Sequence, residues 1–274
     1  LDLEKLGFRP DELDEFRNLV AKPNGIILVT GPTGSGKTTT LYSVLMEANT
    51  VDSKIITTED PVEYDLEGIV QVQVNEEIGL TFADCLRSIL RQDPDKILVG
   101  EVRDLETAQI AVESSLTGHI VYSTLHTNDA PSSVTRILDL GLEPFLISAT
   151  LEGVIAQRLA RRICLQCKTA YDPTEQELYE LELTASETQG REFYFGKGCK
   201  SCNGTGYKGR VALFEMMLVN DRLRDMIMNA GSTADLRSAA REDGMRTLRD
   251  SGLLQIYDGI STIEEVVKET ISTV

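Results

Sequence analysis

A glycine-rich segment near the start of the chain has the composition of a phosphate site. Residues 31–38 read GPTGSGKT and fit the pattern G-x-x-x-x-G-K-S/T at every fixed position. Its glycines allow backbone amides to close around a phosphate, and the N-terminus of the following helix adds partial positive charge. The alternative, a glycine-rich turn without a ligand, leaves the complete motif unexplained. We predict that a nucleotide contacts Gly31, Pro32, Thr33, Gly34, Ser35, Gly36, Lys37, Thr38 and Thr39.

Within this loop two side chains have chemical roles. We expect Lys37 to reach the β- and γ-phosphates as a catalytic cation, and the Thr38 hydroxyl to ligate Mg²⁺. Hydrolysis also needs carboxylates that hold the metal and a water. Glu63, in the segment EDPVE, follows one apolar run, and Glu101 ends another. Because the carboxyl ends of parallel strands meet around a ligand, both are candidate catalytic residues, and Glu101 is also a candidate magnesium ligand.

The run that ends at Glu101 resembles a Walker B strand but has Gly100 where an aspartate is usual. Glu101 must therefore take the role of the aspartate beside the metal, or share that role with the acidic cluster at 59–63. For both acids, a solvated carboxylate at a strand end is the alternative. Which of Glu63 and Glu101 activates the water stays open.

Histidines and arginines add further candidates. His119 and His126 flank an apolar run, where an imidazole can sense a γ-phosphate or orient a carboxylate, although a structural role is the alternative for each. Arg87 and Arg91 are four residues apart and share a helix face, and Arg103 follows the Walker B run. Such arginines suit a finger directed at a neighbouring subunit's phosphates, or ordinary salt bridges.

Four of the five cysteines form two C-x-x-C pairs separated by 31 residues. Four thiolates can surround a Zn²⁺ ion, and nearby glycines allow the second pair to turn tightly. An iron–sulfur cluster or a redox pair is the alternative. Because no ligand position is left for a catalytic water, we expect the metal to stabilise the fold. The predicted ligands are Cys164, Cys167, Cys199 and Cys202.

The elements that must position these residues alternate between strands and helices. Apolar runs predict strands at 26–30, 54–58, 69–74, 96–101 and 120–125. Helical patterns lie between them at 37–48, 82–92 and 104–116, and 131–162 is predicted to continue as one or two helices. This order predicts an α/β fold with an open, mainly parallel sheet. We expect three segments: an ATPase core over 1–162, a tetracysteine zinc insert over 163–210 and a mostly helical C-terminal subdomain over 211–274.

Composition excludes other classes of protein. The 274 residues carry 27 basic and 44 acidic side chains, a net charge of −17, which repels phosphate backbones and argues against nucleic acid as a partner. No apolar run reaches the roughly 18 residues that span a bilayer. The paired cysteines without a secretory signal predict a reducing compartment. A first residue other than methionine predicts a fragment of a longer chain.

Four ordered segments carry a resemblance to a known family. They are GPTGSGKTTTLYS, TTEDPVEYDLEGIVQVQVN, LRSILRQDPDKILVGEVRDLETAQIA and TGHIVYSTLHTNDA. They resemble the secretion ATPases of the type II secretion and type IV pilus assembly machines, and the tetracysteine segment fits as well. The resemblance implies a RecA-like P-loop core that works as a homo-hexameric ring with ATP, Mg²⁺ and structural Zn²⁺. It also implies a cytoplasmic protein that is peripheral to the inner membrane through its partners.

The resemblance assigns roles and partners. Lys37 and Thr38 match the Walker A loop, Glu63 the aspartate box, Glu101 Walker B, and His119 and His126 the histidine box; Arg87, Arg91 and Arg103 match positions that approach the nucleotide in such rings. The family's Walker B also lacks the aspartate. The implied partners are an inner-membrane platform protein, the cytoplasmic domain of a membrane anchor protein, and N-terminal domains of the same chain. Without those domains we expect this segment to be a poor ATPase.

The resemblance leaves the apparatus open. Pilus retraction motors generally lack the tetracysteine insert, which favours a motor for pseudopilus assembly in type II secretion or for pilus extension. YDLEGIVQVQVN and LGLEPFLISATLEGV are closer to the secretion branch, and we favour that branch. Two alternatives remain: a RecA-like motor on nucleic acid, supported by little beyond Arg158, Arg161 and Arg162, and an interaction module that uses nucleotide as a switch.

Overall fold

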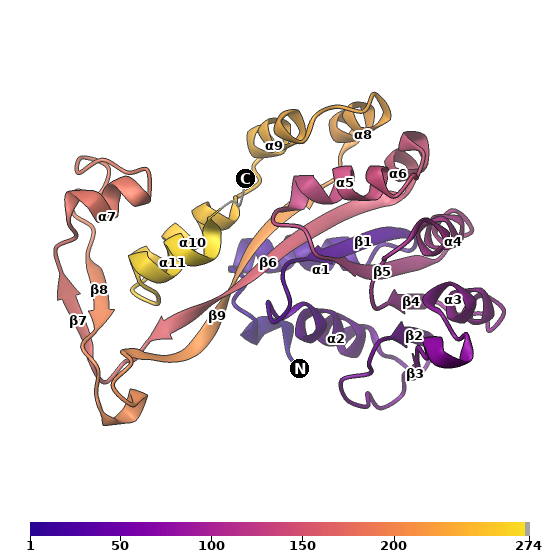
Figure 1. Cartoon of the computed structure of the whole chain (residues 1–274), viewed down its shortest axis with the longest axis horizontal. Coiled ribbons are helices and arrows are strands. Elements are labelled where there is room, and N and C mark those ends of the chain that lie inside the picture. The colour runs from indigo at the N-terminus through magenta and orange to yellow at the C-terminus, as the bar shows by residue number, and fades with distance from the viewer. Residues whose placement is uncertain (272–274) are drawn as a thin grey trace. The chain divides into compact units, whose positions relative to one another are not determined.

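The computed structural model describes residues 1–271 (Figure 1). These residues form two compact units. Unit 1 comprises Leu1–Ala156 and Met216–Met245, and unit 2 comprises Gln157–Glu215 and the described residues from Arg246 onward. The segments of the two units thus alternate along the sequence. The division into three segments at 162 and 210 stays a prediction.

A seven-stranded sheet has the strand order β3-β2-β4-β5-β1-β6-β9. The pairs that join β3, β2, β4, β5, β1 and β6 are all parallel, which confirms the mainly parallel α/β sheet. The last two strands of this order each contain residues of both units. The strands are β1 (Gly25–Thr30), β2 (Ile55–Glu59), β3 (Val70–Gln73), β4 (Lys96–Val99), β5 (Ile120–Leu125), β6 (Leu151–Ile163) and β9 (Tyr207–Leu218).

Helices cover both faces of the sheet in unit 1. All six residues of β5 are buried. The Tyr122 hydroxyl donates to Val20 O in α1 at 2.6 Å, whereas Val121 and Ser123 point to the opposite face, beneath α4. Burial on both faces explains why the strand sequences show no polar alternation. The helices of unit 1 are α1 (Pro10–Val20), α2 (Lys37–Ala48), α3 (Phe82–Leu90), α4 (Leu105–Leu116), α5 (Ala130–Asp139), α6 (Pro144–Thr150), α8 (Asp221–Met228) and α9 (Thr233–Glu242), with 3-10 turns at Leu3–Lys5 and Glu76–Ile78.

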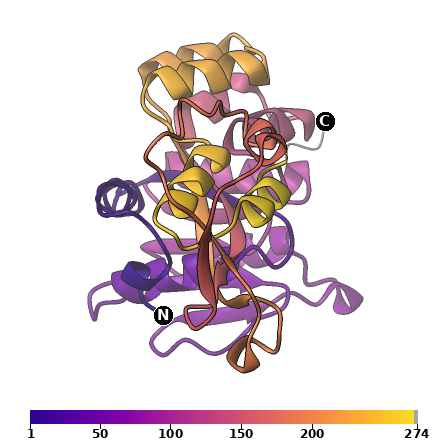
Figure 2. The same cartoon turned by 90° about the vertical axis from the view of Figure 1, so that its left-hand side faces the viewer.

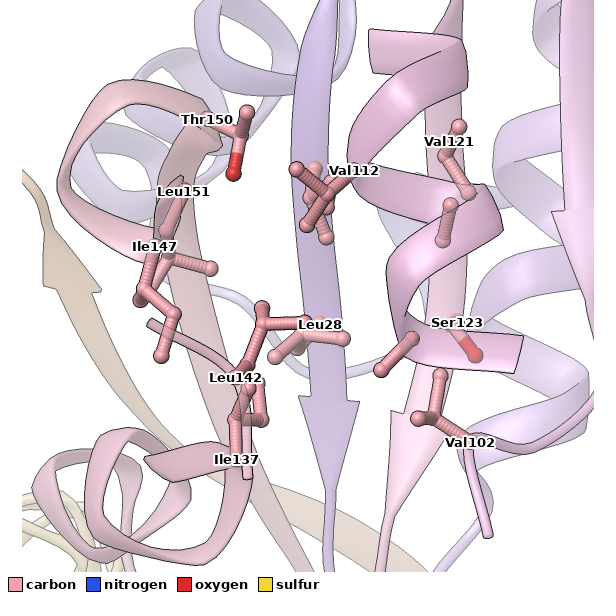
Figure 3. A pocket seen from close by; sticks show the side chains of 13 residues that line it. Leu28, Val102, Val112, Val121, Ser123, Ile137, Leu142, Ile147, Thr150 and Leu151 are labelled. Atoms are coloured by element: carbon pink, nitrogen blue, oxygen red, sulfur yellow. The ribbon is translucent and has the colours of Figure 1, made fainter. Parts of the chain in front are cut away.

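A small apolar cavity lies in the core of unit 1 (Figure 3). Its volume is about 20 Å³, and its lining includes Leu28 of β1, Val112 of α4 and Ile147 of α6. A space of this size, with almost no polar lining, is a gap in packing rather than a site for a nucleotide. The functional site must therefore lie at the polar edge of the sheet.

The prediction of helix over 131–162 is right for α5 and α6 and wrong for β6. The sequence VIAQRLARRI at 154–163 places apolar residues three and four positions apart, as an amphipathic helix does. In the structure Val154 pairs with Leu28 and Ile155 with Val29, in a parallel ladder with β1. Because a strand buried on both faces needs no alternation, the tertiary pairing outweighs the helical pattern.

Unit 2 packs a hairpin against helices. Its hairpin strands are antiparallel, and both views show α10 and α11 beside the hairpin (Figures 1 and 2). One core joins Leu178, Leu181 and Phe193 to Ile256 and Val266, so the tetracysteine segment and the last helices share buried surface. No helix in the described part of the chain has the length and apolarity that a bilayer crossing requires. The elements are β7 (Lys168–Tyr171), α7 (Glu175–Glu180), β8 (Phe193–Gly196), a 3-10 turn at Lys200–Cys202, α10 (Leu248–Tyr257) and α11 (Ile263–Thr270).

Candidate nucleotide site and metal centre

The glycine-rich loop connects β1 to α2 and presents the N-terminus of that helix. Gly36 caps α2 with a φ of 90°, a left-handed conformation that a residue with a side chain rarely adopts. Its carbonyl accepts the Thr40 N–H at 3.0 Å, which starts the helix. The Ser35 hydroxyl is buried and has no hydrogen-bond partner among the described residues. A buried orphan donor beside free helix amides fits a phosphate oxygen.

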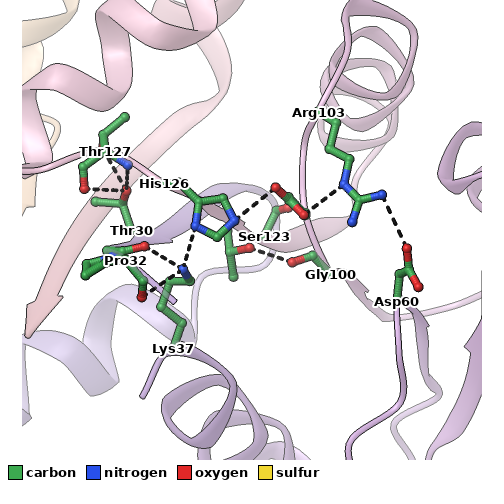
Figure 4. A network of polar contacts seen from close by, with 12 residues as sticks. Thr30, Pro32, Lys37, Asp60, Gly100, Arg103, Ser123, His126 and Thr127 are labelled. Carbon is green, nitrogen blue, oxygen red and sulfur yellow. Dashed lines mark hydrogen bonds and ion pairs between the residues drawn. The ribbon is translucent and has the colours of Figure 1, made fainter. Parts of the chain in front are cut away.

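Lys37 contacts both the loop and a histidine. Its ammonium donates to Gly31 O at 2.5 Å and to Pro32 O at 3.4 Å. A third contact joins Lys37 Nζ to His126 Nδ1 at 3.2 Å (Figure 4). Because an ammonium has no lone pair, Nδ1 must be the acceptor, and the ring proton then lies on Nε2. That nitrogen is 3.0 Å from Glu101 Oε1, so the imidazole donates to this carboxylate.

The turn that carries His126 is fixed to the end of β1. The Thr127 hydroxyl lies 2.6 Å from Thr30 Oγ1, and the Thr127 N–H donates to the same oxygen at 2.8 Å. Thr30 is the residue that precedes the glycine-rich loop. The histidine and the loop are therefore held at the same edge of the sheet.

Glu101 lies between two donors. While Oε1 accepts from His126, Oε2 accepts from Arg103 Nε at 2.9 Å. The Arg103 guanidinium also reaches Asp60 Oδ2 at 3.3 Å (Figure 4). It lies over the Phe82 ring, 5.2 Å from its centroid. These contacts connect Lys37 to the acidic residues that follow β2 and β4. Arg103 thus bonds one carboxylate that follows β4, Glu101, and one that follows β2, Asp60.

Both candidate catalytic carboxylates border one pocket beside the loop. The pocket has a volume of about 80 Å³, and its lining includes Thr38, Glu59, Glu63 and Glu101. A hydroxyl and carboxylates are the oxygen ligands that Mg²⁺ prefers. Thr38 and Glu101 are therefore suited to hold the ion, and Glu63 lies near enough to the same space to act on a water.

Gly100 explains the missing Walker B aspartate. A Cβ atom at this position would lie 3.1 Å from Thr58 O, 3.2 Å from Glu59 Cα and 3.4 Å from Phe82 Cε1. The backbone here is held close to β2, because the Gly100 N–H donates to Thr58 O at 2.7 Å. An aspartate side chain has no room, so the carboxylate that serves the pocket comes from Glu101.

Three predicted residues are not brought to this pocket. His119 precedes β5, with its Nδ1 3.0 Å from Ser114 O, so the six residues of β5 place it about 20 Å from His126. Arg87 on α3 pairs with Asp84 and Glu106. Arg91 ends α3 at the surface, and its side chain makes no ion pair within residues 1–271.

Sequence reasoning missed Tyr42, which lines the pocket, and Gln71, which bonds a residue of its lining. Tyr42 and Gln71 both bond the buried carboxylate of Glu59. The sequence shows them only as an apolar-face tyrosine of α2 and a polar residue of a short strand. Their meeting depends on the pairing of β2 with β3 and on the packing of α2, which no local pattern contains.

The four predicted cysteine ligands lie together in unit 2. All are free thiols, and their sulfur atoms lie within 4.8 Å of one another. Three of the separations are 3.8 Å for Cys164 to Cys199, 3.9 Å for Cys167 to Cys202 and 3.7 Å for Cys199 to Cys202. A tetrahedral ion with Zn–S bonds of about 2.3 Å requires sulfur separations of about 3.8 Å. A disulfide needs about 2.05 Å, and a multi-iron cluster needs wider spacing.

Backbone amides also favour thiolate at this centre. Cys202 Sγ accepts N–H bonds from Cys199 at 3.3 Å and from Gly206 at 3.2 Å. Burial opposes ionisation, but these amides and the neighbouring thiols Cys199 and Cys167 lower the pKa of Cys202 to about 6, whereas burial raises the pKa of Cys167 to about 11. Since thiolate is the form that binds metal, the donor set fits a structural Zn²⁺ ion.

Comparison with known proteins adds an independent finding. A family model described as a type II/IV secretion system protein matches residues 1–268. The type IV pilus assembly ATPase PilB of Thermus thermophilus is 51% identical over 98% of this chain and 30% of its own length. The type II secretion system protein HxcR of Pseudomonas aeruginosa is 50% identical over 98% of this chain and 54% of its own length. The chain therefore spans about a third to half of these relatives.

Solved structures agree with the fold. The pilus retraction motor PilT, solved with bound ADP, superimposes on this chain with a TM-score of 0.74 at 30% identity. The match covers 100% of this chain and 68% of the PilT chain. The Legionella pneumophila ATPase DotB gives a TM-score of 0.69 at 26% identity over 97% of this chain and 64% of its own.

Proposed function

Since the chain belongs to the type II/IV secretion system protein family, we propose that it binds and hydrolyses ATP as the motor segment of a secretion or pilus assembly machine. The observation that carries the proposal is that Thr38 and Glu101 line one polar pocket beside the glycine-rich loop, while His126 links Glu101 to Lys37. The ADP in the related PilT structure supports an adenine nucleotide as the ligand.

In the proposed reaction a water attacks the γ-phosphate in line with the leaving oxygen. Lys37 exchanges its bond to Gly31 O for phosphate oxygens and neutralises their charge. Glu63 or Glu101 accepts the proton of the water. The Thr38 hydroxyl and Glu101 would hold Mg²⁺, which would supply positive charge to stabilise the charge that develops on the phosphates.

The proposed assembly is a homo-hexameric ring. Hydrolysis in such rings draws arginines from a neighbouring subunit, and Arg91 is suited to that role because it is exposed and has no ion pair in the described chain. Arg87 is the second candidate. The remaining proposed partners are an inner-membrane platform protein, the cytoplasmic domain of a membrane anchor protein and additional N-terminal domains of the same chain. Through them the motor acts in the cytoplasm at the inner membrane.

We propose a structural Zn²⁺ ion at the four cysteines of unit 2, on the strength of their sulfur separations. The proposed apparatus is type II secretion, with pilus extension as the alternative. Support for secretion comes from the segments YDLEGIVQVQVN and LGLEPFLISATLEGV, whereas identities of 51% to PilB and 50% to HxcR favour neither branch.

Substitution of Lys37 by alanine tests the activity. Steady-state release of phosphate from ATP by the complete protein is expected to fall to background, because the ammonium at the loop is lost. Lys5→Ala is the matched control, since Lys5 is exposed and pairs only with Asp2. Substantial turnover by purified Lys37→Ala protein would contradict the proposal, and stimulation of the unsubstituted protein by DNA or RNA would favour a nucleic-acid motor.

A further inference from the structure

A buried carboxylate directly precedes the segment 60–66, which carries the candidate catalytic residue Glu63. Glu59 ends β2 and is only 4% exposed. A buried carboxylate requires hydrogen-bond donors, and Glu59 has three. Thr57 Oγ1 donates to Oε2 at 2.6 Å, Gln71 Nε2 donates to the same oxygen at 3.1 Å, and the Tyr42 hydroxyl donates to Oε1. Its own neighbours therefore occupy most of the hydrogen-bonding capacity of Glu59.

Tyr42 connects this carboxylate to the segment 60–66. Its side chain is fully buried in α2, one turn after Thr38. Burial, and then the bond to Glu59, raise the pKa of Tyr42, so the hydroxyl keeps its proton. Because that single proton is donated to Glu59, the oxygen lone pair is free to accept, and it accepts the backbone N–H of Glu63 at 3.3 Å.

Most residues of the segment 60–66 are exposed, so burial contributes little to fixing its position. Asp60, Glu63 and Tyr64 are exposed. Besides the bond from the Glu63 N–H to Tyr42, the Tyr64 ring packs edge-on against the Tyr42 ring, with centroids 4.9 Å apart, and Gln71 Nε2 donates to Tyr64 O at 3.2 Å. The N–H groups of Val62 and Leu66 donate to Gln73 Oε1 at 3.3 Å and to Gln71 Oε1 at 2.7 Å. Tyr42 thus links the helix that begins with Lys37 to the backbone of Glu63.

We propose that Tyr42, held by Glu59, is a positioning residue that fixes Glu63 relative to the nucleotide-binding helix. The inference rests on the proposed ATPase function and adds to it a residue that touches neither nucleotide nor metal. In this arrangement Tyr42 sets the distance between the phosphate that Lys37 holds and the carboxylate that faces the attacking water. Loss of the hydroxyl leaves the nucleotide cradle intact but releases the Glu63 backbone.

The test is Tyr42→Phe in the complete protein, with Tyr122→Phe as the matched control. Tyr122 is an equally buried tyrosine whose hydroxyl bonds Val20 O beside α1, away from the pocket. We expect Tyr42→Phe to lower kcat about 10-fold or more while the ATP dissociation constant changes less than about 2-fold. Tyr122→Phe is expected to leave both unchanged. Hydrogen exchange of the peptide over 60–66 should accelerate in Tyr42→Phe alone.

A double-mutant cycle separates positioning from general loss of structure. If Tyr42 acts through Glu63, Tyr42→Phe causes no further fall of kcat in a Glu63→Gln background. If the two substitutions together lower kcat by the product of their separate effects, or if Tyr42→Phe leaves kcat unchanged, the inference is overturned. Inactivity of the unsubstituted protein would instead contradict the proposed function. If Tyr42→Phe fails to fold, Glu59→Gln, which places an amide against the Gln71 donor, must show the same dependence on Glu63.

Discussion

His126 Nε2 donates to Glu101 Oε1 over 3.0 Å, and this bond joins the carboxyl ends of β5 and β4. The other ring nitrogen accepts from Lys37, so one imidazole links the phosphate-binding lysine to the candidate Walker B carboxylate. Movement of Lys37 toward a phosphate removes the proton donor at Nδ1.

His126→Ala is expected to lower kcat about 10- to 100-fold, because Lys37 and Glu101 both lose a partner that orients them. His119→Ala is the control, since His119 lies at the opposite end of β5. Steady-state ATPase rates of both variants measure the difference. Equal losses in the two variants would show that the imidazoles act through structure in general.

Arg103→Ala is expected to impair its own subunit rather than a neighbour. Arg103 bonds Glu101 and Asp60 of the same chain. We therefore expect no recovery of activity when Arg103→Ala subunits are mixed with Lys37→Ala subunits. An arginine that served the adjacent site would restore activity in such mixed rings. Arg91→Ala, tested in the same mixtures, is the expected positive case.

Gly100→Ala is expected to destabilise unit 1 by about 1–3 kcal/mol, the usual cost of overpacking. The added Cβ meets the carbonyl of Thr58 at 3.1 Å, and a backbone atom cannot yield as a side chain does. Urea unfolding measures the free energy. Full stability of the variant would mean that β4 can move away from β2, and the account of the missing aspartate would then fail.

Removal of the metal is expected to affect unit 2. Purified protein should contain one zinc per chain by elemental analysis, and Cys199→Ser should lose it. Cys85→Ser is the matched control, because Cys85 is buried in α3 and belongs to unit 1. Zinc that persists in Cys199→Ser, or is absent from the unsubstituted protein, would contradict the tetrahedral site.

Acid is expected to weaken an ion pair of unit 2 between the buried Glu265 and the exposed Arg161. Glu265 is 2% exposed, and its Oε2 accepts from Arg161 Nε at 2.9 Å and from Arg161 Nη2 at 2.8 Å. Burial alone would raise the pKa of Glu265, but the Arg161 bonds lower it below 4.5. The stabilisation is thus complete above pH 4.5 and is lost as pH falls through the lowered value.

Glu265→Gln tests this ion pair. The variant is expected to be about 2 kcal/mol less stable at pH 7 and to lose less stability than the parent on acidification. Urea unfolding at pH 7 and at about pH 4 measures both quantities. Parallel losses in the two proteins would assign the acid sensitivity to other carboxylates.

Local motifs allowed the strongest predictions. The glycine-rich loop and α2 begin where the motif places them, because chain conformation there is dictated by residues adjacent in sequence. His119 and His126 could not be distinguished, since both flank the same apolar run and only the direction of the strand separates them. The role of Tyr42 depends on three elements that meet only in the folded chain. β6 was mistaken for helix because its pairing partner is more than 100 residues distant.

The interleaved order of the two units has a consequence for biosynthesis. In unit 1, Thr135 of α5 bonds Thr233 of α9 at 2.5 Å, and Asp129 bonds Arg237 at 2.5 Å. Between these partners the ribosome must make all of the tetracysteine segment. These contacts of the nucleotide-binding unit can therefore form only after the whole tetracysteine segment has been synthesised.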